Sequence, residues 1–82
     1  MSTIEIRNNH QVRVGTTRIA VKGTLPVRER DGTVRSRSVI VMPDAKVEVF
    51  EGDEVELAGH RYRVTIDVSV PKVTLTPLPP EG

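Results

Sequence analysis

The sequence contains no cysteine and no tryptophan, and its large aromatic side chains are one phenylalanine and one tyrosine. Without cysteine, neither a disulfide nor a thiolate metal site can stabilise the fold. With so few aromatics, the core must be aliphatic. Leucine and alanine are scarce, with four and three copies, whereas valine, isoleucine and threonine make up 27 of the 82 residues. Because β-branched residues suit strands better than helices, the composition predicts an all-β protein.

Long apolar runs are also absent. The longest covers only residues 39–42, whereas a transmembrane helix needs about 20 apolar residues. The N-terminus is polar from Ser2 onward and has no signal-peptide core, so we expect synthesis in the cytoplasm and no membrane contact. The length predicts one small domain that buries about 60% of its unfolded surface. Domains of this size often depend on a partner or on oligomerisation for stability.

Apolar and polar residues alternate through most of the chain, which is typical of strands with one buried face. The clearest stretch, residues 47–70, contains turns at Gly52 and Gly59, where glycine readily adopts a positive φ. It predicts a three-stranded meander whose exposed face carries Glu48, Glu54, Glu56, Arg61, Arg63 and Asp67. Alternating runs at residues 3–7, 11–14, 16–21 and 72–78 predict further strands.

These patterns together predict one all-β domain, residues 1–78, formed by about six to seven short antiparallel strands. Short strands joined by regular turns are typical of a small β-barrel or a sandwich. Residues 79–82 begin with two prolines, so they are expected to form an extended C-terminal tail and not a strand.

A basic hairpin is predicted before the meander. The dipeptide Asp31-Gly32 is a strong signal for a two-residue hairpin turn. Pro26 cannot donate a hydrogen bond within a sheet, so its strand must lie at an edge or project from the sheet. The resulting arm covers about residues 24–38. Its candidate binding residues, for a protein partner or for nucleic acid, are Arg28, Arg30, Arg35 and Arg37.

The net charge of +1 hides an uneven distribution of charge along the chain. Residues 1–42 contain eight Lys or Arg and three acids, and residues 43–82 contain four and eight. Such patterns report on solubility and association. Two interpretations stay open: two solvated faces that differ by chance, or a module whose two ends meet partners of opposite charge, including a neighbouring copy.

Residues suited to catalysis or metal binding are not arranged for either role. His10 and His60 fall in predicted turns, without cysteine or acid at ligand spacing. No serine lies in a Gly-x-Ser-x-Gly elbow, no glycine-rich loop precedes a helix, and the acids of residues 51–56 lack calcium-loop spacing. We therefore predict no enzyme activity, no catalytic or metal-binding residue, no cofactor and no small-molecule substrate.

The second half of the chain resembles one group of known proteins. Its pattern consists of Met42-Pro43, an acidic turn, Gly52-Asp53-x-Val55 and Gly59-x-x-Tyr62-x-Val64. Over about residues 42–70 it is similar to small virion proteins of tailed bacteriophages, of the head–tail connector group (head completion or stopper proteins). In that group the segment forms a hairpin of a small β-barrel. The resemblance implies a non-enzymatic structural protein of the virion, assembled in the host cytoplasm, that forms a ring around the DNA channel.

The position in a virion stays open between stopper, adaptor, capsid decoration and tail protein. In a ring, the arm would embrace a neighbouring subunit or gate the channel, and its acidic acceptor face would be Glu48, Glu54 and Glu56. The alternative function is a small β-barrel that binds nucleic acid through the arginine-rich arm, with non-specific DNA contact. Only Phe50 and Tyr62 are available for base stacking, which disfavours single-strand binding.

Overall fold

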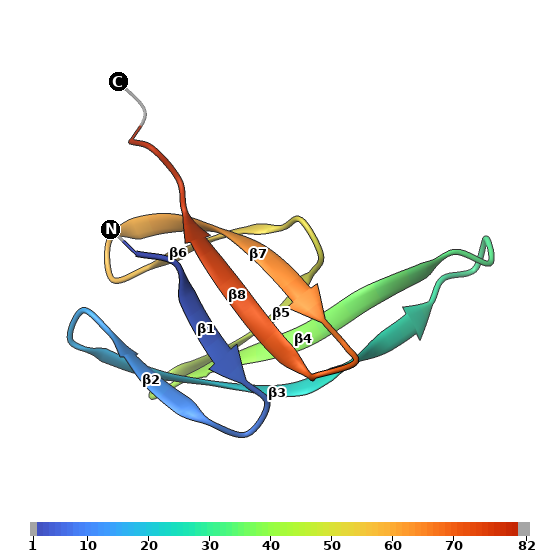
Figure 1. Ribbon diagram of the computed structural model, residues 1–82, viewed down its shortest axis with the longest axis horizontal. Coiled ribbons are helices and arrows are strands. Elements are labelled where there is room, and N and C mark those ends of the chain that lie inside the picture. The colour runs from blue at the N-terminus through green and yellow to red at the C-terminus, as the bar shows by residue number, and fades with distance from the viewer. Residues whose placement is uncertain (1, 81–82) are drawn as a thin grey trace.

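Strands account for nearly all regular structure in the computed structural model, which describes residues 2–80 (Figure 1). The strands are β1 (Ile4–Arg7), β2 (Gln11–Val14), β3 (Thr17–Arg28), β4 (Val34–Met42), β5 (Ala45–Phe50), β6 (Glu54–Leu57), β7 (His60–Asp67) and β8 (Lys72–Pro77). The all-β prediction is confirmed, with eight strands in place of six or seven. Across these described residues no helix is long and apolar enough to cross a membrane.

The strands form two antiparallel sheets of four strands each. The first sheet has the order β1-β8-β7-β6, and the second sheet has the order β2-β3-β4-β5. Figure 1 shows β1, β8 and β7 lying across β3 and β4. Each strand is paired only within its own sheet, so the two sheets form a sandwich and not a closed barrel.

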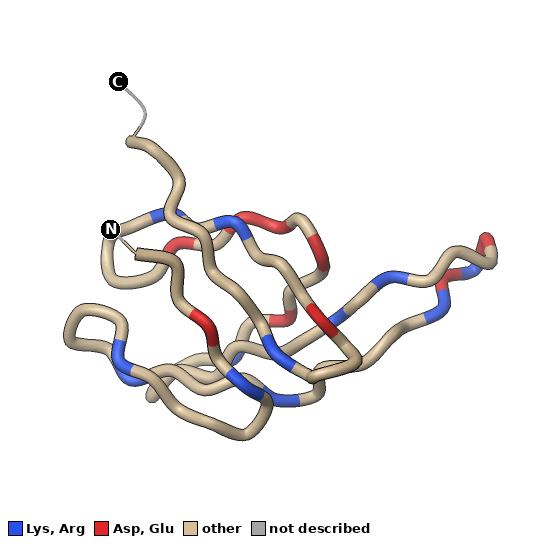
Figure 2. The backbone as a smooth tube through the Cα atoms, viewed as in Figure 1, with Lys and Arg blue, Asp and Glu red and all other residues tan. Residues whose placement is uncertain are grey.

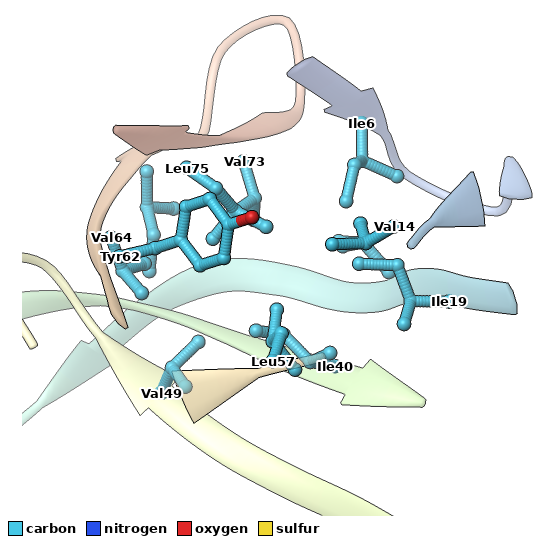
Figure 3. Close-up of a cluster of buried hydrophobic side chains, with 12 residues drawn as sticks. Ile6, Val14, Ile19, Ile40, Val49, Leu57, Tyr62, Val64, Val73 and Leu75 are labelled. Atoms are coloured by element: carbon cyan, nitrogen blue, oxygen red, sulfur yellow. The ribbon is translucent and has the colours of Figure 1, made fainter. Parts of the chain in front are cut away.

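The core lies between the inner faces of the two sheets. Figure 3 shows Tyr62 and Leu75 of the first sheet facing Ile40 and Val49 of the second. Twelve apolar side chains are buried there: Ile6, Val14, Ile19, Val21, Ile40, Val49, Leu57, Tyr62, Val64, Ile66, Val73 and Leu75. They occupy alternate positions of their strands, as side chains of period two must when one face is buried. The composition therefore predicts the aliphatic character of this core correctly.

The predicted three-stranded meander is wrong. Of its three strands, β5 pairs with β4 in the second sheet, and β6 and β7 form a hairpin with each other. Residues 51–53 form a corner between the sheets. The Glu51 N–H donates to the carbonyl of Ser36 in β4 (3.1 Å), and the Gly52 N–H donates to the carbonyl of Val64 in β7 (2.9 Å). The chain thus changes sheets within three residues, although Glu-Gly-Asp has the composition of a hairpin turn.

The strand β7 ends at Asp67, three residues earlier than the alternating pattern predicts, and Val68 and Val70 are exposed in the following turn. The Asp67 carboxylate stops the strand by accepting hydrogen bonds locally. One oxygen, Oδ1, accepts from the Ser69 N–H (3.0 Å), the Ser69 hydroxyl (2.7 Å) and the Val70 N–H (3.3 Å). Such side-chain contacts compete with strand pairing and favour a turn.

Three carboxylates should make the protein less stable in acid. Hydrogen bonds from Lys72, Thr33 and Ser69 respectively lower the pKa values of Glu5, Asp31 and Asp67. The ordinary pKa values are 4.5 for Glu and 3.8 for Asp. A carboxylate whose pKa is lower in the folded state stabilises the protein at any pH above its ordinary pKa, and this stability is lost as the pH falls below that value. We expect the urea midpoint to decrease below about pH 4.

The variant Asp67→Asn should be less stable at neutral pH and should lose less stability between neutral and acidic pH than the parent protein. The matched control is Asp44→Asn, because Asp44 is exposed. Urea titrations at several pH values check the expectation. An Asp67→Asn variant with the full acid dependence of the parent would contradict it.

Candidate functional site

The arm extends beyond the sandwich at one end of the molecule (Figure 1). The strand β2 pairs with residues 17–20 of β3, and β5 pairs with residues 37–42 of β4. The distal residues 25–28 and 34–36 of the two strands pair with each other. The projecting hairpin of residues 24–38 is therefore present as predicted. Beyond Ser36, whose carbonyl accepts from the Glu51 N–H, neither outer edge of the arm has a neighbouring strand within the described residues.

The turn at the tip is wider than the predicted two-residue Asp31-Gly32 turn. The Glu29 N–H donates to the Thr33 carbonyl (2.8 Å), so three residues lie between these two, and within the turn the Gly32 N–H donates to the Glu29 carbonyl (3.1 Å). Asp31 Oδ1 accepts from the Thr33 N–H (3.0 Å) and hydroxyl (2.6 Å). An aspartate that binds the backbone two residues ahead stabilises a local turn of its own, which explains the wider loop.

A β-bulge fixes the base of the arm between Lys22 and Leu25. Ser38 is fully buried there, and its hydroxyl contacts Thr24 Oγ1 (2.8 Å) and donates to the Lys22 carbonyl (3.3 Å). Gly23 has a φ of +63°, and a Cβ at this position would lie 3.3 Å from Arg37 Nη1. Bulges increase the local twist of a ribbon, so these residues set the direction in which the arm leaves the sandwich.

The four predicted arginines of the arm divide into two pairs. Arg35 lies 4.1 Å from the centre of the Phe50 ring and 3.4 Å from Glu29 Oε1. Arg37 donates from Nε to Glu48 Oε2 (2.7 Å). These two are held against their own chain. Arg28 and Arg30, in contrast, are exposed and make no hydrogen bond or ion pair within residues 2–80.

The three predicted acceptor residues do not form one face, because the meander that would have joined them is absent. Glu48 lies on β5 at the outer face of the second sheet, beside Arg37. Glu54 and Glu56 lie on β6 at the outer face of the first sheet. Glu54 is 2.5 Å from Arg61 and 3.8 Å from Arg63, so Glu56 is the predicted acceptor least engaged by its own chain.

A hollow of about 200 Å³ lies between the edge strands β5 and β6. Its apolar lining includes Met42, Val47 and Val55, and Glu54 and Glu56 lie at its rim. Val47 remains 38% exposed because neither sheet covers it. Sequence reasoning missed this feature, since β5 and β6 appear in the sequence as neighbours in one sheet. An exposed valine on a strand carries no distinguishing signal in the sequence alone.

Clusters for metal binding are absent within the described part of the chain, where no three His, Cys, Asp or Glu side chains lie together. His10 lies between β1 and β2 as predicted, whereas His60 is the first residue of β7 and not part of the turn. Both are exposed. The arm and the surfaces around it are therefore the candidate functional features of residues 2–80.

Comparison of this chain with protein-family models, with curated proteins and with solved structures finds no match.

Proposed function

We propose that this is a non-enzymatic assembly protein in which the arm of one copy docks on the next copy. One observation carries the proposal: the arm projects without a neighbouring strand, while its Leu25 and Val34 side chains are 42% and 59% exposed. A two-stranded ribbon is at best marginally stable alone. An arm with apolar side chains on both faces gains stability when a second surface covers it.

The hollow between β5 and β6 is the acceptor in this proposal. Arg28 and Val34 are directly opposite each other in the ribbon, so their side chains share one face. That face matches an apolar floor with a rim formed by Glu54 and Glu56. Arginine suits such a contact because its fork binds carboxylates bidentately. The arm and the hollow are different patches, so the contact is heterologous and closes into a ring if the rotation per subunit permits.

Within this proposal the ring belongs to a phage virion, at the head–tail connector or a related position. The assignment rests on the resemblance to connector proteins over about residues 42–70, of which the part from Gly59 to Val64 lies in the β6–β7 hairpin. Gene order provides an independent test. A gene between portal, capsid and tail genes supports the virion assignment, whereas a gene among replication or repair functions would contradict it.

Charge reversal at the tip of the arm should abolish assembly. We expect Arg28→Glu combined with Arg30→Glu to weaken self-association at least about 100-fold, because like charges across an interface cost several kcal/mol and each 1.4 kcal/mol is tenfold. Sedimentation velocity over a range of protein concentrations measures the effect. Adding Glu56→Lys to the same chain should restore part of the association.

The matched control is Arg13→Glu combined with Arg18→Glu, which makes the same change in net charge on β2 and β3, away from the arm tip. It should leave assembly intact. Circular dichroism confirms that each variant is folded. A parent protein that stays monomeric at about 0.1 mM, roughly a hundredfold above micromolar association, would overturn the proposal. A reversed arm that still assembles would also overturn it.

A further inference from the structure

The charge of this molecule also divides between the outer faces of its two sheets. The outer face of the first sheet carries equal numbers of cations and carboxylates: Glu5, Arg7, Glu54, Glu56, Arg61, Arg63, Asp67 and Lys72. Several are paired within the chain, such as Lys72 with Glu5 at 2.7 Å. This face therefore has no net charge, and most of its charged side chains pair with one another.

The outer face of the second sheet is basic. Its strand residues include six cations and one carboxylate, Glu48, which Arg37 holds at 2.7 Å. Arg35 is likewise held by Glu29. The remaining four cations, Arg13, Arg18, Lys22 and Lys46, are all exposed and make no ion pair or side-chain hydrogen bond within residues 2–80. We call these four residues the basic face. Figure 2 shows Lys and Arg spread over β2 and β3, with Asp and Glu gathered around the β5–β6 connection.

Two of the four cations repel each other because the strand register places them side by side. Arg13 and Arg18 are directly opposite in the β2–β3 pair. Like charges at opposite positions of two strands destabilise the pair. Nothing on this chain compensates them, because neither arginine has an acidic neighbour within hydrogen-bond distance in the described residues. An anion placed over the pair would remove the repulsion.

From this arrangement we infer that the basic face binds the phosphate backbone of a nucleic acid, on a surface separate from the arm tip. The side chains between the cations include Ala20 and Val41, which with Gln11 and Arg18 line a shallow hollow of about 180 Å³. Small side chains there allow a phosphate backbone to approach the sheet closely. Because none of the lining side chains is aromatic, contacts are to phosphates and not to stacked bases.

Nucleic acid fits this face better than an acidic protein does. The centre of a protein–protein interface is depleted in charge and enriched in aromatic anchors. The basic face has exposed cations throughout, and the aromatic residue on the outer face of this sheet, Phe50, lies under Arg35 at 4.1 Å. Interfaces with nucleic acid are polar and strongly positive. The cations are also spread over three strands, β2, β3 and β5, which suits an extended polyanion.

Salt dependence of DNA binding tests the inference. The probe is a fluorescein-labelled duplex of about 20 base pairs, longer than the face, and the readout is anisotropy between about 50 and 300 mM salt. Four phosphate contacts predict a slope of log K against log[salt] of about −3.6. The variant Arg18→Gln with Lys22→Gln removes two of the four contacts and should reduce the slope to about −1.8. If the plots of log K against log[salt] for the parent and the variant meet at 1 M salt, this corresponds to roughly 60-fold weaker binding at 0.1 M salt. It should also raise the Tm slightly, because Arg13 loses its repelling partner.

Two matched variants make the result decisive. Arg7→Gln with Arg63→Gln makes the same charge change on the outer face of the first sheet and should leave the slope and affinity unchanged. Arg28→Gln with Arg30→Gln makes the same charge change at the arm tip, which the inference places outside the DNA contact. Absence of DNA binding at 50 mM salt, equal weakening by the Arg7 and Arg63 pair, or loss confined to the arm variant would each overturn the inference. Tighter binding of polyglutamate than of DNA would overturn it in favour of an acidic protein partner.

Discussion

Truncation of Leu75 to alanine is expected to lower the free energy of unfolding by about 2–5 kcal/mol. Leu75 is fully buried on β8, between its neighbours β1 and β7. A domain of this length has a total stability of roughly 4–12 kcal/mol, so one truncation removes a large part of it. The cost combines lost transfer free energy with the cavity left behind, because tightly packed neighbours relax only partly.

The matched control for Leu75 is Leu25→Ala, the same change on the arm, where the side chain is 42% exposed. At concentrations where the protein is monomeric, we expect Leu25→Ala to alter stability by less than about 1 kcal/mol. Urea unfolding followed by circular dichroism measures both. Equal losses in the two variants would mean that the core does not lie between the two sheets as described.

Sequence periodicity was sufficient for the strands and insufficient for their assignment to sheets. Alternation depends only on which face of each strand is buried, so residues 54–57 and 60–67 could be recognised locally. Pairing of β1 with β8 joins segments from opposite ends of the described chain, and no local pattern encodes it. The strand β5 turns back onto β4 in a tight hairpin at Met42 and Ala45, but no local pattern shows that its pairing ends there and does not continue to β6. Glu51-Gly52-Asp53 therefore predicted a hairpin turn where the chain crosses between sheets.

The error in sheet assignment also explains which parts of the candidate site could be predicted. The arm is a local hairpin, so the dipeptide Asp31-Gly32 and Pro26 were enough to predict it. The basic face combines Arg13, Arg18 and Lys22 of β2 and β3 with Lys46, and Lys46 joins it only because β5 belongs to the second sheet. Counting charges by halves of the sequence placed Lys46 with the acidic half and so missed its place on this face.

The two proposed surfaces lie on different parts of the second sheet and have different consequences for binding. The arm combines exposed apolar side chains with two free arginines, and apolar burial gives protein contacts that persist in salt. The basic face offers charge without apolar anchors, so its binding weakens steeply as salt rises. A ring held by the arms would present many basic faces to one DNA molecule, which raises the overall affinity through multivalency.

Loss of the Glu51 side chain should destabilise the corner where the chain changes sheets. Glu51 Oε1 accepts a hydrogen bond from the backbone N–H of Ile66 at 2.7 Å. The strand β6 pairs with β7 only as far as Arg63, so it provides no acceptor for Ile66, whose side chain is 7% exposed. We expect Glu51→Ala to cost about 1–3 kcal/mol, because a nearly buried donor loses its partner.

Glu51→Gln keeps an acceptor oxygen at the same position and should restore most of the stability, although a neutral acceptor binds less strongly than a carboxylate. Glu56→Ala is the control, because Glu56 is exposed on β6 and its loss should change stability by no more than about 0.5 kcal/mol. Urea unfolding gives the free energies, and hydrogen exchange at the Ile66 amide reports the bond directly. Unchanged exchange at Ile66 in Glu51→Ala, or equal losses in Glu51→Ala and Glu56→Ala, would show that this carboxylate does not hold the two sheets together.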